Sequence, residues 1–155
     1  MSRLDRRAFC AALASAILIP GSAPAKSAPK VLLVCQYGSV KSAIARELLK
    51  RRSSERRVPL IVYSRGITPE EHLPDDLRAR LMAEGVDPKA EPLRKLRQAD
   101  LDAADLVILF DPLPPDLRAP KARDWSAVPS MIARYPDARA DLDRRIGSLL
   151  DQFAR

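Results

Sequence analysis

The side chains best able to do chemistry lie together in one short segment, Cys35-Gln36-Tyr37-Gly38-Ser39-Val40-Lys41-Ser42. Within it a thiol, a lysine and a hydroxyl stand at positions 35, 41 and 42. A thiolate is a strong nucleophile, and a nearby cation favours the thiolate over the thiol. Such a group suits attack on an oxyanion centre such as phosphorus.

The flanking residues predict how this segment is held. The apolar run 31–34 is typical of a parallel strand buried on both faces. Apolar residues recur at helical spacing from about 42 to 52. Backbone N–H groups in a turn between a strand and a helix converge on one point, where the helix adds partial positive charge. We therefore expect residues 36–41 to bind a phosphate-like anion beside the Cys35 thiolate, with Ser42 capping the helix or hydrogen-bonding the sulfur.

Strand and helix patterns alternate along the rest of the chain. The patterns predict strands over 60–63 and 106–110, a short fourth strand around 124–128, and helices over 74–85 and from about Pro136. This alternation predicts an α/β fold, a three-layer domain with a four-stranded parallel sheet. Ligands of such sheets bind at the carboxyl ends of the strands, which is where the Cys35 segment would lie.

The first 25 residues have the layout of an export signal. Arginines precede an apolar run over 8–19, and small residues follow and end at Ala25. The pair Arg6-Arg7 resembles a twin-arginine signal, although Asp5 stands where Ser or Thr is expected, so an ordinary export signal stays open. We expect residues 1–25 to be cleaved, residues 26–155 to form the domain, and the product to be periplasmic or secreted.

Composition excludes several classes of protein. The 155 residues include no apolar run long enough for a multi-pass membrane protein, and we expect no membrane attachment after the leader is removed. One histidine and two cysteines cannot build a histidine-rich or four-cysteine metal site, so we expect no metal and no cofactor. The net charge of +7 favours anionic partners. The basic runs 50–52 and 56–57 are interpreted as solvated helix surface rather than a nucleic-acid site.

The segment 31–49 resembles the active-site loop of low-molecular-weight protein tyrosine phosphatases and of the arsenate reductases that share their fold. The family pattern is a strand, then C-x5-R-[ST], then a helix, and Cys35 matches the nucleophile and Ser42 the hydroxyl. The resemblance spans nearly all of the chain after the leader, through further matching segments at 64–66, 74–87, 104–111 and 125–129.

The loop departs from the family pattern in ways that weaken catalysis. Lys41 stands in place of the loop arginine, and a lysine offers a point charge where arginine would clasp two phosphoryl oxygens. Gly38 replaces the turn asparagine, and Val40 replaces the second loop cysteine of many phosphatases. After loss of the leader, Cys35 is the one cysteine, which excludes reductases that pass oxidation between their own cysteines.

The general acid of the family also has no direct match. The family carries Asp-Pro before the last helix, where this chain reads Val128-Pro129-Ser130-Met131, so that Ser130 stands where the resemblance implies the acid. Asp111 is followed by proline but ends the third strand, in a different loop. Asp124 is therefore the nearer stand-in for the acid.

The resemblance implies a phosphatase-like protein, the leader predicts its export, and the departures predict weak turnover. Cys35 would attack phosphorus, Lys41 and the loop amides would stabilise charge, and Ser42 would steady the thiolate. Its substrate would be a phosphorylated protein or a small phosphate ester or oxyanion. Two alternatives stay open: a non-catalytic binder of oxyanions or phosphopeptides, and an arsenate reductase-like enzyme that depends on an external thiol.

Overall fold

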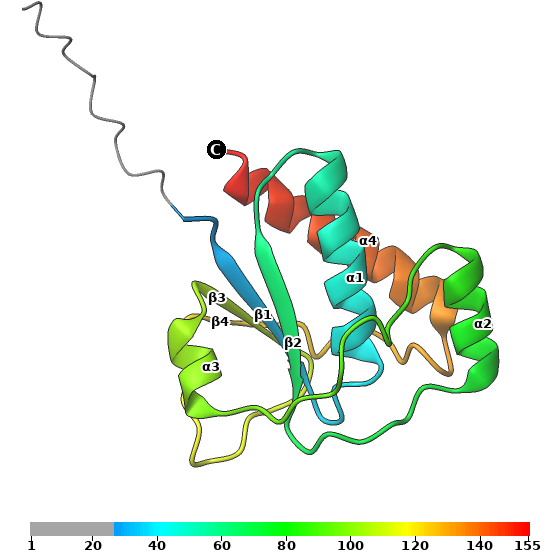
Figure 1. The fold of residues 1–155 in the computed structure, drawn as a ribbon, viewed down its shortest axis with the longest axis horizontal. Helices are drawn as coiled ribbons and strands as arrows, with labels where there is room; N and C mark the ends of the chain where they lie inside the picture. Colours follow the sequence, from blue (N-terminus) through cyan, green and yellow to red (C-terminus); the bar gives the residue numbers. More distant parts are fainter. Residues whose placement is uncertain (1–26) are drawn as a thin grey trace, which may run out of the picture.

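The computed structural model describes residues 27–155, so the predicted leader lies outside the described residues. Strands and helices alternate as the sequence predicts (Figure 1). The elements in chain order are β1 Lys30–Cys35, α1 Lys41–Glu55, β2 Ile61–Gly66, α2 Asp75–Ala83, α3 Gln98–Ala103, β3 Leu106–Leu109, β4 Ala122–Asp124 and α4 Tyr135–Phe153.

The strands form one parallel sheet in the order β2-β1-β3-β4, which confirms the predicted four-stranded sheet. The apolar run of β1, Val31 to Val34, is fully buried, as a central strand requires. Cys35 ends β1 opposite Gly66 of β2, and Val34 lies opposite Leu109 of β3. The carboxyl ends of three strands therefore meet around the thiol.

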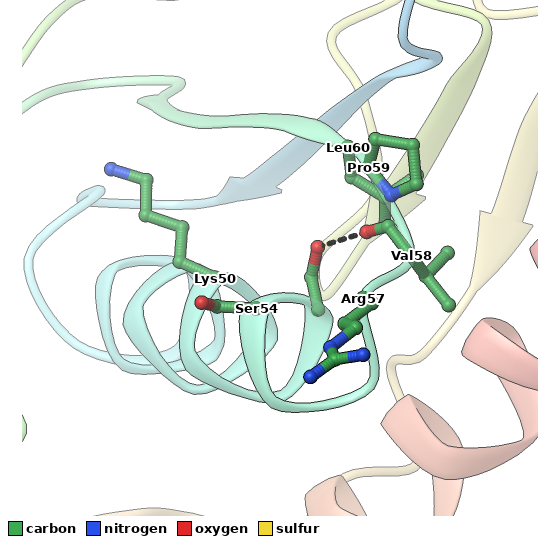
Figure 2. Close-up of a pocket in the computed structure, with 7 residues that line it drawn as sticks. Lys50, Ser54, Arg57, Val58, Pro59 and Leu60 are labelled. Atoms are coloured by element: carbon green, nitrogen blue, oxygen red, sulfur yellow. Dashed lines mark hydrogen bonds between the residues drawn. The ribbon is translucent and has the colours of Figure 1, made fainter.

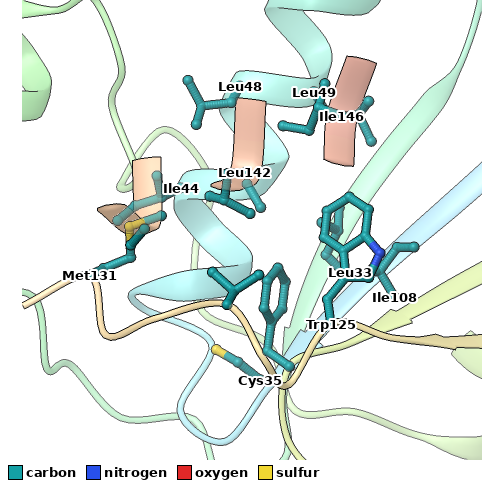
Figure 3. Packing of buried hydrophobic residues seen from close by; sticks show 14 of the residues in the cluster. Leu33, Cys35, Ile44, Leu48, Leu49, Ile108, Trp125, Met131, Leu142 and Ile146 are labelled. Carbon is teal, nitrogen blue, oxygen red and sulfur yellow. The ribbon is translucent and has the colours of Figure 1, made fainter. Parts of the chain in front are cut away.

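Helices pack on both faces of the sheet through hydrophobic side chains, which gives the domain three layers. On one face α1 and α4 pack against the strands, with Ile44, Leu142 and Ile146 near Leu33 (Figures 1 and 3). On the other face β1 packs against Leu101 of α3. Alternate side chains of a strand point to opposite faces, which explains why neighbouring leucines of β1 belong to different clusters.

Two elements differ from the sequence prediction. The fourth strand ends at Asp124 rather than starting there, because the buried Trp125 turns the chain and its carbonyl accepts the N–H of Val128. The helix α3 was not predicted, since its six residues are too few to show a helical apolar period.

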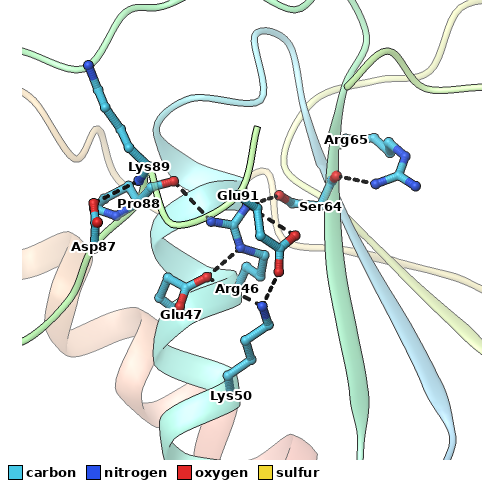
Figure 4. A network of polar contacts seen from close by, with 9 residues as sticks. All are labelled: Arg46, Glu47, Lys50, Ser64, Arg65, Asp87, Pro88, Lys89 and Glu91. Carbon is cyan, nitrogen blue, oxygen red and sulfur yellow. Dashed lines mark hydrogen bonds and ion pairs between the residues drawn. The ribbon is translucent and has the colours of Figure 1, made fainter. Parts of the chain in front are cut away.

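A buried arginine ties the helix after the Cys35 loop to the rest of the domain (Figure 4). The Arg46 side chain of α1 is 2% exposed. Its guanidinium donates to Ser64 Oγ of β2 at 2.8 Å, to the Pro88 carbonyl at 3.0 Å and to Glu47 at 2.6 Å. These bonds fix α1 against β2 and against the segment that follows α2. They hold the loop between β1 and α1 from its helical side.

Candidate active site

Cys35 lies at the end of β1 with two hydrogen-bonding groups on its sulfur. The Ser42 Oγ is 3.1 Å from Sγ, and the Gly38 N–H donates to Sγ at 3.2 Å. The thiol is buried, with 5% of the residue exposed. The Gly38 N–H is a donor to the sulfur, and the Ser42 hydroxyl can donate or accept.

Two glycines let the loop lie against the end of β2. Gly38 has φ of +77°, the left-handed region that favours glycine. A Cβ on Gly38 would lie 2.8 Å from the backbone N of Gly66, and one on Gly66 would lie 2.7 Å from the Tyr37 carbonyl oxygen. The close approach of Gly38 to Gly66 explains why glycine suits position 38, where the phosphatases that this loop resembles carry asparagine.

A pocket of about 250 Å³ opens above Cys35. Four segments that are far apart in sequence enclose it. They contribute Cys35, Gln36, Tyr37, Val40 and Lys41 from the loop, His72, Asp111, and Ser130, Met131 and Ile132. Of the predicted anion-binding residues, Gly38 and Ser39 are buried in the loop and do not line the pocket.

Lys41 reaches across to the opposite wall of this pocket. Its Nζ donates to the Val128 carbonyl at 2.9 Å, in the segment just before Ser130. An ammonium group has three N–H donors, so two remain for an anion in the pocket. Lys41 thus supplies charge from a fixed point and lacks the planar fork of an arginine.

The structure places Asp111, and not Asp124, at the pocket. Asp111 follows β3, and β3 lies beside β1, so Asp111 is close to the Cys35 loop. Its Oδ2 accepts the Gln36 N–H at 2.8 Å. Asp124 is exposed on β4 and does not line the pocket. Hydrogen bonds from Ser126, the N–H among them at 2.7 Å, hold the pKa of Asp124 below its ordinary value. Adjacent strands bring their loops together, so Asp111 lines the pocket although the chain order puts it in a different loop.

An aromatic pair stands at the mouth of the pocket. The rings of Tyr37 and His72 stack with centroids 3.9 Å apart. The His72 backbone N–H donates to Ser39 Oγ at 3.0 Å. The His72 side-chain Nε2 lies 3.2 Å from Glu70 Oε2. The sequence predicted Tyr37 only as one of the anion-binding residues 36–41 and indicated no role for His72. No local signal could have found it, since His72 meets the loop only through the fold.

No group of three His, Cys, Asp or Glu side chains within residues 27–155 could hold a metal ion. None of the helices in that range is long and apolar enough to cross a membrane. Cys35 is the free cysteine of this part of the chain.

Comparison with protein families matches residues 30–140 to the low molecular weight phosphotyrosine protein phosphatases. The chain belongs to this family. Comparison with curated proteins found no significant match.

Solved structures of the same fold include phosphatases and arsenate reductases. A low molecular weight protein tyrosine phosphatase from T. tengcongensis is 21% identical, with a TM-score of 0.66 over 81% of this chain and 99% of its own. Wzb from Vibrio vulnificus, in complex with benzylphosphonate, is 16% identical, with a TM-score of 0.64 over 81% and 99%. A thioredoxin-dependent arsenate reductase from Corynebacterium glutamicum is 22% identical, with a TM-score of 0.63 over 84% of this chain and 64% of its own.

Proposed function

We propose that this protein hydrolyses phosphate monoesters through a phosphorylated Cys35, with slow turnover. The observation that carries the proposal is the pair of contacts to Cys35 Sγ from Ser42 and from the Gly38 N–H, at 3.1 and 3.2 Å. We infer that these contacts favour the nucleophilic form of the sulfur, which lines a pocket of about 250 Å³. Membership of the phosphatase family supports the same reaction.

The reaction needs two steps. The Cys35 thiolate attacks phosphorus, an S–P bond forms, and the P–O bond to the leaving group breaks as that oxygen takes a proton. Water then attacks phosphorus and gives up a proton, the S–P bond breaks, and inorganic phosphate leaves with the thiolate restored. The loop N–H groups and Lys41 stabilise the charge on the phosphoryl oxygens in both steps.

We assign the proton transfers to Asp111. One of its carboxylate oxygens is positioned by the Gln36 N–H, which leaves the other to carry a proton toward the pocket. It is the carboxylate among the described residues that line the pocket. Ser130 occupies the opposite wall, at the sequence position of the family's usual acid, and a serine hydroxyl is a far weaker acid than a carboxyl group.

The mouth of the pocket favours an aryl phosphate. Tyr37 and His72 form one side, and Met131 and Ile132 line the pocket as well. Aromatic and thioether side chains bind the faces and edges of aromatic rings. A phosphotyrosine side chain of a protein is therefore the substrate that we propose. The complex of the related Wzb with benzylphosphonate supports an aryl ligand in this fold.

A second candidate, a binder of phosphorylated groups without turnover, is favoured by one contact. Lys41 gives a hydrogen bond to the Val128 carbonyl, so part of its donor capacity is already used. A loop that retains its amides but holds its cation at the pocket wall binds an anion better than it stabilises a transition state.

Hydrolysis of 4-nitrophenyl phosphate and of a phosphotyrosine peptide separates these functions. We expect slow release of phosphate by the wild type, none by Cys35→Ser, and a loss of about 100-fold for Asp111→Asn on the peptide. The loss should be much smaller on 4-nitrophenyl phosphate, whose leaving group needs no proton. Phosphate binding without hydrolysis of either ester would support the binder. Arsenate reduction that requires an added thiol would support a reductase.

We also propose that the protein is exported. The proposal is supported by the basic, apolar and small-residue layout of positions 1–25. Cell fractionation followed by N-terminal sequencing tests it. We expect the protein outside the cytoplasm with Lys26 at its N-terminus, and full-length protein in the cytosol alone would contradict export.

A further inference from the structure

A group of cations lies at the carboxyl edge of the sheet, beyond the site already described. Arg65, Arg94, Lys95 and Arg97 line an open hollow of about 460 Å³, together with Asp100. Asp100 is the one carboxylate that residues 27–155 contribute to the lining, and both of its oxygens accept hydrogen bonds. Arg65 donates to Asp100 Oδ1 at 2.9 Å, and the Arg97 backbone N–H donates to its other oxygen at 3.0 Å.

The remaining three cations have no counter-charge. Arg94, Lys95 and Arg97 are exposed, and none forms an ion pair with any residue of the described range 27–155. Many other basic side chains of the domain do form such pairs, as Arg52, Arg139 and Arg145 illustrate. Clustered cations without partners raise the local potential and attract anions.

Backbone pairing fixes the position of this group relative to Cys35. Gly66 lies opposite Cys35 on one side and opposite Lys95 on the other. The Gly66 N–H donates to the Arg94 carbonyl at 2.9 Å, and the Gly66 carbonyl accepts the Leu96 N–H at 2.8 Å. Since paired strands lie about 4.8 Å apart, the backbone of Lys95 is roughly 10 Å from that of Cys35. An extended peptide covers that distance in about three residues.

We propose that the hollow lined by Arg94, Lys95 and Arg97 binds acidic residues that flank the phosphorylated residue of a protein substrate. This inference rests on the proposed phosphatase function and adds the substrate class, an acidic phosphoprotein segment. The backbone of Lys95 lies roughly 10 Å from that of Cys35 on the same edge of the sheet, a distance that one extended peptide spans. Nucleic acid fits less well, because no aromatic side chain among the described residues lines the hollow for base stacking.

The test compares two phosphotyrosine peptides, one with glutamates at the third and fourth positions on either side of the phosphotyrosine and one with glutamines there. The variant is R94E/K95E, and the control with the same change of charge is R57E/R123E. Arg57 lies at the far end of α1, beside a separate hollow (Figure 2), and Arg123 lies on β4. All proteins are used as the whole chain, at low and at high salt.

We expect kcat/KM of the wild type to be about fivefold to tenfold higher for the acidic peptide at low salt. Two or three exposed ion pairs contribute a preference of this size. R94E/K95E should lose this preference through KM, while hydrolysis of 4-nitrophenyl phosphate is unchanged, and the control should keep the preference. Equal preference in wild type and R94E/K95E would overturn the proposal, as would an equal loss in the control.

Binding of the same peptides to Cys35→Ser protein, followed by fluorescence anisotropy, keeps the inference testable if turnover is absent. A preference for the acidic peptide that disappears in R94E/K95E supports the hollow even when the phosphatase proposal fails. Binding of a single-stranded oligonucleotide that the same reversal abolishes, without any peptide preference, would instead assign the hollow to nucleic acid and overturn the proposal.

Discussion

Lys41 and Val128 meet across the pocket, with the lysine Nζ 2.9 Å from the carbonyl oxygen. The cation of the Cys35 loop is thereby joined to the wall that carries Ser130, the position where the family has its acid. Both departures from the family pattern therefore line the same pocket. A catalytic deficit from either should be repairable there.

We expect Lys41→Arg combined with Ser130→Asp to raise phosphotyrosine turnover more than either change alone. The arginine restores two parallel hydrogen bonds to phosphoryl oxygens. Loss of one such donor lowers the catalytic rate about 100-fold. The aspartate restores a proton donor, whose absence lowers the catalytic rate about 100- to 10,000-fold. Steady-state kinetics on a phosphotyrosine peptide measures the gain. Unchanged turnover in the double variant would mean that Lys41 and Asp111 already suffice.

Gly66→Ala should remove anion binding. The new Cβ would lie 2.7 Å from the Tyr37 carbonyl oxygen, so the loop must move away from β2. Phosphate titration by calorimetry, together with thermal unfolding, measures both effects. Gly147→Ala is the matched control, because nothing lies within 4 Å of its Cβ and it should leave phosphate binding intact. It should add about 1 kcal/mol to the free energy of unfolding.

Arg46→Ala should destabilise the domain by about 3 kcal/mol or more, since it removes a buried cation and leaves its partners unsatisfied. Urea unfolding measures the loss. Arg52→Ala, on the same helix, removes an exposed ion pair with Asp143 and should cost less than about 1 kcal/mol. Equal effects of the two substitutions would show that the network of Figure 4 does not fasten α1.

Glu91 makes the domain sensitive to acid. Burial raises the pKa of Glu91, but its bond with Lys50 and the charge of Arg46 outweigh burial and hold the pKa below its ordinary value of 4.5. A carboxyl group with a lowered folded-state pKa stabilises the fold above that ordinary value, and the contribution is lost as pH falls through the folded pKa. Glu91→Gln should therefore be less stable than wild type at pH 7, and the difference should be smaller at pH 3. Urea unfolding at the two pH values checks this, and a constant difference would contradict it.

The sequence predicted the Cys35 loop because strand, turn and helix are contiguous there, and each has its own local pattern. It could not place Asp111, which the chain order assigned to a different loop. The sheet order puts β3 beside β1, so the loops after the two strands adjoin, and this adjacency is not readable from the order of elements. The bond between Lys41 and Val128 and the stacking of His72 on Tyr37 likewise depend on tertiary packing. Asp124 is close in sequence to the missing acid but lies on β4, outside the lining of the pocket.

We propose that Cys35 itself carries the phosphoryl group during turnover. Acid quenching of the protein during hydrolysis of 4-nitrophenyl phosphate, followed by mass spectrometry of its peptides, tests this directly. We expect one phosphoryl group on the peptide that contains Cys35, present during turnover, absent after the ester is exhausted, and absent in Cys35→Ala. Hydrolysis with that peptide unmodified at every time point, or hydrolysis that persists in Cys35→Ala, would contradict the account.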